Sequence, residues 1–275
     1  MRTATLSAAL LVLAASAHAS HDDSSGLYRR STPSCKAHVR VKAAPVAVPE
    51  VMLQGFEWGQ NGGGTYYNTM KGRAKELGEA GISAIWLPPS TKGSSANDVG
   101  YGIYDLWDLG EFSQKGTTRT KWGTKAELVA LIKELKKYGT GAYLDAVLNQ
   151  RGSADYSETF YATEVSSSDR NKAISDEHQI QARTGYAFEG RDGEYSSLRL
   201  NHTHFTATDY DDLSQSTSIF RVAGKEWSTH VSTQNGNYDY LLLNDVDYSN
   251  EEVRQDTLAW GEWVIKETGA AGFRV

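Results

Sequence analysis

From residue 51 onward, short apolar segments alternate with amphipathic ones, which is the pattern of strands separated by helices. Helical spacing of the apolar residues is clearest in residues 66–80 and 124–138. Strands that are joined through helices pair in parallel, so we expect an α/β fold built on a parallel sheet. The apolar segments that predict its four strands are residues 51–56, 82–87, 141–148 and 270–275.

Polar residues indicate where two of the helices begin. Thr124 followed by Glu127, and Ser249 followed by Glu252, each have the spacing of a capping box. Glycine often ends a helix because it adopts the left-handed conformation without steric cost, and Gly139 follows the second helical segment. We therefore expect one helix from about residue 125 to Gly139 and another that begins just after Ser249.

Two connections are much longer than the usual link between a strand and a helix. Residues 88–123 follow the second predicted strand, and residues 150–248 follow the third. Loops of this length are normally functional or contain structure of their own. Both leave the carboxyl end of a parallel strand, where α/β proteins build their sites. We expect the functional residues here, and the second connection is long enough to form an inserted, β-rich subdomain.

The composition argues against two classes of partner. The formal net charge of −6 argues against nucleic acid, since phosphate binding needs a concentrated basic face. No apolar run reaches the roughly 20 residues needed to span a bilayer, so no membrane partner is expected. Hydrophobic residues make up 39% and charged residues 23% of the chain, which is typical of a globular protein.

The N-terminus has the features of a secretory signal peptide. Residues 6–15 are mostly apolar, and residues 17–19 have the small-x-small pattern of a cleavage site. We expect residues 1–19 to be a signal peptide, residues 20–48 to be a flexible lead-in, and the protein to be secreted. A buried helix or a membrane anchor is the alternative interpretation of the same segment.

Six segments carry a more specific signal, and they resemble those of α-amylases in the clan of (β/α)8 glycoside hydrolases (glycoside hydrolase family 13). Their order and spacing are similar to those of the single-chain bacterial liquefying type and its fungal relatives. Any one segment is a weak signal, whereas six in order are a strong one. The segments are residues 54–58 (Gln-Gly-Phe-Glu-Trp), 85–89 (Ile-Trp-Leu-Pro-Pro), 98–106 (beginning Asp-Val-Gly-Tyr-Gly), 145–149 (Asp-Ala-Val-Leu-Asn), 236–241 (Gly-Asn-Tyr-Asp-Tyr-Leu) and 272–274 (Gly-Phe-Arg).

The resemblance implies the domain organisation. It identifies the four strands as the first four of a (β/α)8 TIM barrel, so the barrel formed by this chain would be incomplete. Residues 49–149 would carry strands one to three, and residues 150–244 would be an inserted calcium-binding subdomain. Residues 245–275 would carry the third barrel helix and the fourth strand.

The resemblance also implies the activity, which is endo-hydrolysis of α-1,4-glucans such as starch and glycogen with retention. Retaining glycosidases use two carboxyl groups about 5 Å apart. The family nucleophile would directly follow Val275, so no catalytic carboxylate is assigned here and the chain is expected to be inactive alone. Two alternatives stay open: a non-catalytic relic that binds glucan, and a chain that does not fold stably.

Three residues are expected at the sugar site. Tyr101, between two glycines, resembles the aromatic platform under the sugar at the cleavage point, although tyrosine is more often a core residue. Arg274 matches the arginine that keeps the family nucleophile ionised, the alternative being a surface arginine at a strand end. Gln150 departs from the family, which places histidine there to bond the sugar hydroxymethyl group. The expected partner is starch or maltooligosaccharide, and the expected state is a monomer.

Oxygen-bearing side chains predict a calcium site. Ca²⁺ takes about six to eight oxygen ligands, and Asn149, Asp239, Asp245 and Asp247 supply such oxygens. The alternative interpretation is that these residues belong to turns and helix caps, where Asn and Asp are common. In the family, the structural calcium has ligands that match Asn149, Asp239 and Asp245, while Asp247 is added as a carboxylate of the same segment. We expect one calcium ion.

Two further motifs have ordinary interpretations. His202 and His204 have the alternate spacing of zinc ligands, but no third ligand is evident, so a polar pair in a loop is preferred. Asn201 begins a formal N-glycosylation triplet, and such triplets also occur by chance.

Overall fold

The structure is a computed structural model that describes residues 50–275. The predicted signal peptide and lead-in, residues 1–48, lie outside the described residues. Among the helices of residues 50–275, none has both the length and the apolar character required to cross a bilayer.

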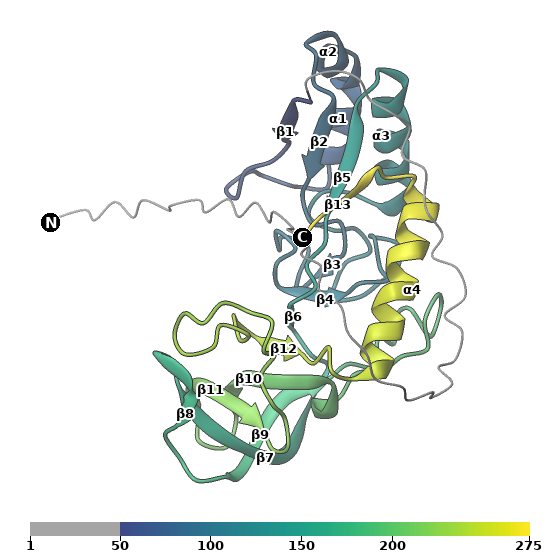
Figure 1. The fold of residues 1–275 in the computed structure, drawn as a ribbon. Helices are drawn as coiled ribbons and strands as arrows, with labels where there is room; N and C mark the ends of the chain where they lie inside the picture. Colours follow the sequence, from purple (N-terminus) through teal and green to yellow (C-terminus); the bar gives the residue numbers. More distant parts are fainter. Residues whose placement is uncertain (1–49) are drawn as a thin grey trace, which may run out of the picture. The chain divides into compact units, whose positions relative to one another are not determined.

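Four strands form a parallel sheet in the order β1-β2-β5-β13 (Figure 1). All three pairings are parallel, which confirms the arrangement that the alternation of strands and helices predicts. Arg274 pairs with Asp145 in this sheet, so the carboxyl ends of two neighbouring strands meet at one edge. The strands are β1 (Met52–Gln54), β2 (Ala84–Leu87), β5 (Gly141–Asp145) and β13 (Gly272–Arg274).

Helices connect these strands. The segment predicted as one helix, residues 66–80, is two helices that meet at Arg73. The Thr124 capping box is present, because the Thr124 hydroxyl accepts the Glu127 N–H and the Glu127 side chain accepts the Thr124 N–H. The helices are α1 (Tyr66–Gly72), α2 (Ala74–Glu79), α3 (Lys125–Lys137), α4 (Glu251–Thr268) and the short 3₁₀ helix η1 (His202–His204).

The start of α4 differs from the prediction. Its N-cap is Asn250, whose side chain accepts the backbone N–H of Glu252 at 3.0 Å. The hydroxyl of Ser249 donates instead to Asp247 at 2.5 Å. The predicted Ser249 capping box is therefore wrong: the hydroxyl is held by the carboxylate two residues earlier, and the next polar residue caps the helix.

Replacing Thr124 with alanine is expected to lower the free energy of unfolding by about 1 kcal/mol, because the first turn of α3 loses its hydrogen-bond acceptor. Urea denaturation of the full chain measures the change. Thr124→Ser keeps the hydroxyl and is the matched control. An equal loss in both variants would contradict a role for the cap.

The core of this part lies between the parallel sheet and its helices. Leu128, Leu131 and Leu135 recur at helical spacing on α3 and are all inaccessible to solvent. They share one hydrophobic cluster with Ile85 of β2 and Leu144 of β5. Burying one such side chain contributes about 1.5–3 kcal/mol, so this cluster holds the strands at fixed positions.

The two long connections carry strands of their own. The first contains a two-stranded sheet of β3 (Lys92–Gly93) and β4 (Ile103–Asp105). The connection from β5 to α4 forms a seven-stranded sheet, ordered β6-β12-β10-β11-β7-β8 with β9 on β7, and all its pairings are antiparallel (Figure 1). Its strands are β6 (Gln150–Arg151), β7 (Tyr156–Ser166), β8 (Asp169–Ala173), β9 (His178–Gly185), β10 (Phe205–Asp211), β11 (Ser216–Val222) and β12 (Asn244–Val246).

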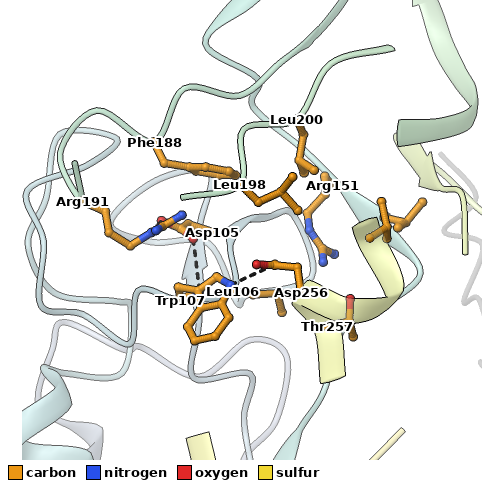
Figure 2. Close-up of a pocket in the computed structure, with 12 residues that line it drawn as sticks. Asp105, Leu106, Trp107, Arg151, Phe188, Arg191, Leu198, Leu200, Asp256 and Thr257 are labelled. Atoms are coloured by element: carbon orange, nitrogen blue, oxygen red, sulfur yellow. Dashed lines mark hydrogen bonds and ion pairs between the residues drawn. The ribbon is translucent and has the colours of Figure 1, made fainter. Parts of the chain in front are cut away.

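A small pocket of about 30 Å³ lies beside the first turns of α4 (Figure 2). Asp105 and Arg191 form a buried ion pair at 2.8 Å in its wall. Asp256 accepts the indole N–H of Trp107 at 3.0 Å. A cavity needs about 10–15 Å³ to hold one water molecule, so this one suits water and is far too small for a sugar.

Candidate functional site

Asp145 lies at the centre of a polar cluster at the carboxyl edge of the parallel sheet. It is the last residue of β5 and is only 2% exposed. The Tyr101 hydroxyl and the Trp86 indole N–H both donate to its Oδ2, at 2.6 and 3.1 Å. Arg274 Nη1 donates to its Oδ1 at 3.3 Å. One buried carboxylate therefore holds three side chains from three different segments at the same edge.

The loop that carries Tyr101 requires both of its flanking glycines. Gly100 has a φ of +115°, and a Cβ there would lie 2.5 Å from the Cβ of Pro89. A Cβ at Gly102 would collide with the carboxylate of Asp98, which itself accepts the Gly100 N–H at 2.7 Å. The Gly-Tyr-Gly sequence thus places Tyr101 through close backbone approach.

Trp58 and Tyr101 form an aromatic surface of two stacked rings. Their ring centres are 5.4 Å apart and their planes differ by 7°, so the rings are stacked. Trp58 is 67% exposed. Burial, together with the hydrogen bond to Asp145, raises the pKa of Tyr101, so its hydroxyl stays protonated and donates at neutral pH. The pair offers apolar ring faces beside fixed polar groups, which is the combination that a sugar ring needs.

Gln150 supports this surface from inside the protein. Its side chain is buried and donates through Nε2 to the backbone oxygen of Tyr101 at 2.9 Å. The structure therefore brings Gln150 to Tyr101, and contact between Gln150 and a sugar stays a prediction. The guanidinium of Arg274 lies 4.6 Å from the ring centre of Trp86, and its side chain is about half exposed.

Sequence reasoning missed three residues of this cluster: Asp145, Trp58 and Trp86. A signal for Asp145 was present, because it is a lone charged residue at the end of an apolar strand. The two tryptophans lie in segments that carry the family resemblance, but nothing in the sequence indicates that one stacks on Tyr101 and the other bonds Asp145.

The predicted calcium ligands lie together around Asp245. Asn149 Nδ2 donates to Asp245 Oδ1 at 3.2 Å, and Oδ2 of the same carboxylate is buried without a hydrogen-bond partner. Burial, and then the charges of Asp239 and Asp247, raise the pKa of Asp245 well above its usual value. Burial and the charge of Asp247 also raise the pKa of Asp239. The carboxylates of Asp239 and Asp245 therefore have no positively charged partner among residues 50–275.

Asp247 differs from the other two carboxylates because its charge is already balanced. Lys225 Nζ lies 2.5 Å from its Oδ2, and the Ser249 hydroxyl donates to its Oδ1. Burial alone would raise the pKa of Asp247, but these hydrogen bonds hold it below its usual value.

The side-chain oxygens of Asn149, Asp239 and Asp245 are chemically suited to a hard cation. Asn149, Asp239 and Asp245 provide amide and carboxylate oxygens, and the unpartnered buried oxygen of Asp245 is the type of atom that a calcium ion satisfies. No cluster of three or more His, Cys, Asp or Glu side chains arranged to hold a metal occurs within residues 50–275. Two carboxylates and one amide are the ligands that fit, and Asp247 is engaged by Lys225.

The two histidines of the His-x-His motif are each paired with a carboxylate. His202 Nδ1 lies 3.0 Å from Glu158 Oε1, and its ring stacks on Phe160. His204 Nε2 lies 3.4 Å from Glu252 Oε2. These contacts agree with the interpretation as a polar pair.

The family model described as "Alpha amylase, catalytic domain" matches residues 70–275, which is well over half of the chain. The chain belongs to the alpha-amylase family. This family consists of glucan-hydrolysing enzymes with a TIM-barrel type of α/β fold, and its members generally bind calcium.

Three relatives give the extent of the similarity. The alpha-amylase of Bacillus licheniformis is 43% identical, over 85% of this chain and 46% of the relative. The alpha-amylase of Geobacillus stearothermophilus is 45% identical, over 82% of this chain and 41% of the relative. The cytoplasmic alpha-amylase of Escherichia coli is 35% identical, over 82% of this chain and 46% of the relative. The chain thus spans less than half the length of each of these relatives.

Proposed function

We propose that this chain forms the first half of the catalytic barrel of a secreted, monomeric α-amylase that cleaves α-1,4-glucans internally with retention. Its four parallel strands would be the first four of eight, and residues 150–244 would be the inserted calcium-binding subdomain. The observation that carries the proposal is the Asp145 cluster, which lies at the carboxyl edge of the sheet with a partly exposed pair of stacked rings, a fixed hydroxyl and an arginine.

Each member of the cluster has a proposed task. The stacked rings of Trp58 and Tyr101 receive the apolar face of a glucose unit. The Tyr101 hydroxyl is held in one orientation, because it donates a hydrogen bond to Asp145 at 2.6 Å. Arg274 keeps a neighbouring carboxylate ionised through its positive charge. In the family that carboxylate is the nucleophile, at the position after Val275, so residues 1–275 by themselves are proposed to bind glucan without cleaving it.

We propose that Asn149, Asp239 and Asp245 hold one calcium ion. When bound, the ion supplies the positive charge that the carboxylates of Asp239 and Asp245 lack. Asp247 can coordinate the ion only if its ion pair with Lys225 breaks. The ion would then act on stability, by fixing the start of the connection after β5 to the segment before α4.

Replacing Trp58 with alanine is expected to weaken maltoheptaose binding about tenfold, because one of the two stacked rings is lost. Stability should change little, since the side chain is largely exposed. Isothermal titration calorimetry on the full chain measures the affinity. Tyr138→Ala removes an exposed aromatic residue just before the start of β5, at the other edge of the sheet, and is the matched control. Equal affinities for the native chain and Trp58→Ala would reject this surface as the sugar site.

A second candidate function is a non-catalytic glucan-binding relic. The observation that favours it is Gln150, which stands where the family has histidine and turns inward to the Tyr101 backbone. A chimera of residues 50–275 with the C-terminal half of an active family member separates the two proposals. Release of reducing sugar from starch would support the amylase, whereas binding without turnover would support the relic.

A further inference from the structure

Tyr156 forms a second exposed aromatic surface, on the antiparallel sheet. It is the first residue of β7 and is 48% exposed. Its ring lies directly over Gly185, its partner on β9, where a Cβ would overlap three atoms of the ring. Because the glycine backbone covers one face of the ring, the orientation of Tyr156 is set by the fold while part of the ring stays open to solvent.

An open hollow of about 520 Å³ borders this ring. Its walls come from the turn at residues 113–115 and from the segment at residues 187–190. The volume lies in the range of about 300–1,000 Å³ that is typical of small-ligand sites. None of its lining residues belongs to the Asp145 cluster, so the two surfaces are separate.

Polar groups at the base of the hollow are held in place. Lys115 has a φ of +51°, and its ammonium donates to Asp155 at 2.7 Å while lying 4.0 Å from the ring centre of Tyr104. Asp155 also accepts the Tyr104 hydroxyl at 2.8 Å and the Ala187 N–H at 2.8 Å. An ammonium has three donors, so Lys115 retains donors for a ligand.

The rim of the hollow adds a free acceptor. Glu189 is exposed, and within residues 50–275 its carboxylate makes no hydrogen bond or ion pair with another side chain. The hollow therefore combines an oriented aromatic ring with one donor group and one acceptor group of opposite charge. This combination suits a neutral ligand with many hydroxyls and an apolar face better than it suits an anion or a cation.

We propose that the Tyr156 hollow is a second binding surface for α-glucan. A glucose unit stacks on Tyr156, and its hydroxyls bond Lys115 and Glu189. The choice of α-glucan as ligand rests on the proposed function, whereas the surface itself rests on the residues above. A polymer that contacts both this hollow and the Trp58–Tyr101 surface gains effective concentration, so the second surface matters more for glycogen than for a short oligosaccharide.

Affinity electrophoresis of the full chain through gels that contain glycogen tests the proposal. Tyr156→Ala is expected to weaken glycogen binding about fivefold to tenfold, and Tyr156→Phe, which keeps the ring, by less than about twofold. Tyr161→Ala is the matched control, because Tyr161 is exposed on the same strand and does not line the hollow. Glu189→Gln alters an exposed side chain that supports no packing, and it is expected to weaken binding about threefold.

Running Trp58→Ala in the same gels separates this proposal from the proposed function. Weakened binding in both Trp58→Ala and Tyr156→Ala supports both surfaces. Loss in Trp58→Ala alone overturns the second surface, and loss in Tyr156→Ala alone overturns the first. No retardation of the native chain overturns both, and a loss in Tyr161→Ala equal to that in Tyr156→Ala overturns the second surface.

Discussion

Replacing Asp145 with alanine is expected to lower the free energy of unfolding by about 3 kcal/mol, because it removes the acceptor that Trp86 and Tyr101 share. The indole N–H and the hydroxyl, which are half-buried, are left without their partner, and Arg274 loses its counter-ion. For a chain of this size, the change corresponds to a fall in Tm of about 6–12 °C. Thermal and urea denaturation of the full chain measure it.

Two variants show whether the effect comes from the buried position. Glu79→Ala breaks an exposed ion pair with Lys75 and is expected to cost less than about 0.5 kcal/mol. Asp145→Asn keeps the size and one acceptor oxygen. Its loss of unfolding free energy should therefore lie between those of Asp145→Ala and Glu79→Ala. The same Asp145→Ala protein should bind maltoheptaose weakly, since Tyr101 is no longer held. Equal stability losses in Asp145→Ala and Glu79→Ala would show that the cluster has no structural role.

Local patterns predicted the elements that depend on local interactions. The four parallel strands follow from apolar runs and from the helices between them, and α3 begins just after Thr124 because both halves of its capping box lie within four residues. The start of α4 was predicted one residue early. Ser249 and Asn250 are both good caps, and the choice between them is made by Asp247, which takes the Ser249 hydroxyl.

Two of the residues that the sequence singled out lie at or beyond strand ends, and the structure brings them together, while their contact with a sugar stays a prediction. Tyr101 and Arg274 reach the same carboxylate, as their positions after β2 and in β13 favour. The stacking of Trp58 on Tyr101 depends on the orientation of two rings from different segments, which no periodicity records. The pairing of Asp247 with Lys225 joins residues 22 positions apart through the antiparallel sheet, so it could not be seen in the sequence.

Calcium is expected to stabilise the native chain and to leave Asp245→Asn unaffected. At a free calcium concentration 100 times the dissociation constant, binding to the folded state adds about 2.7 kcal/mol, because the unfolded chain does not assemble Asn149, Asp239 and Asp245. This gain raises Tm by about 5–10 °C. Melting curves with calcium and with excess chelator measure it.

In excess chelator, the order of stability of the native chain and Asp245→Asn is expected to reverse. Asp245→Asn should then be more stable than the native chain by about 1 kcal/mol, since a neutral amide removes the buried charge next to Asp239. Asp247→Asn is the matched comparison, because it loses the ion pair with Lys225 and should be destabilised both with and without calcium. An undiminished calcium shift in Asp247→Asn would limit the ligands to the other three residues. An undiminished shift in Asp245→Asn would place the ion elsewhere, because the one buried oxygen without a partner in this group would then play no part in holding it.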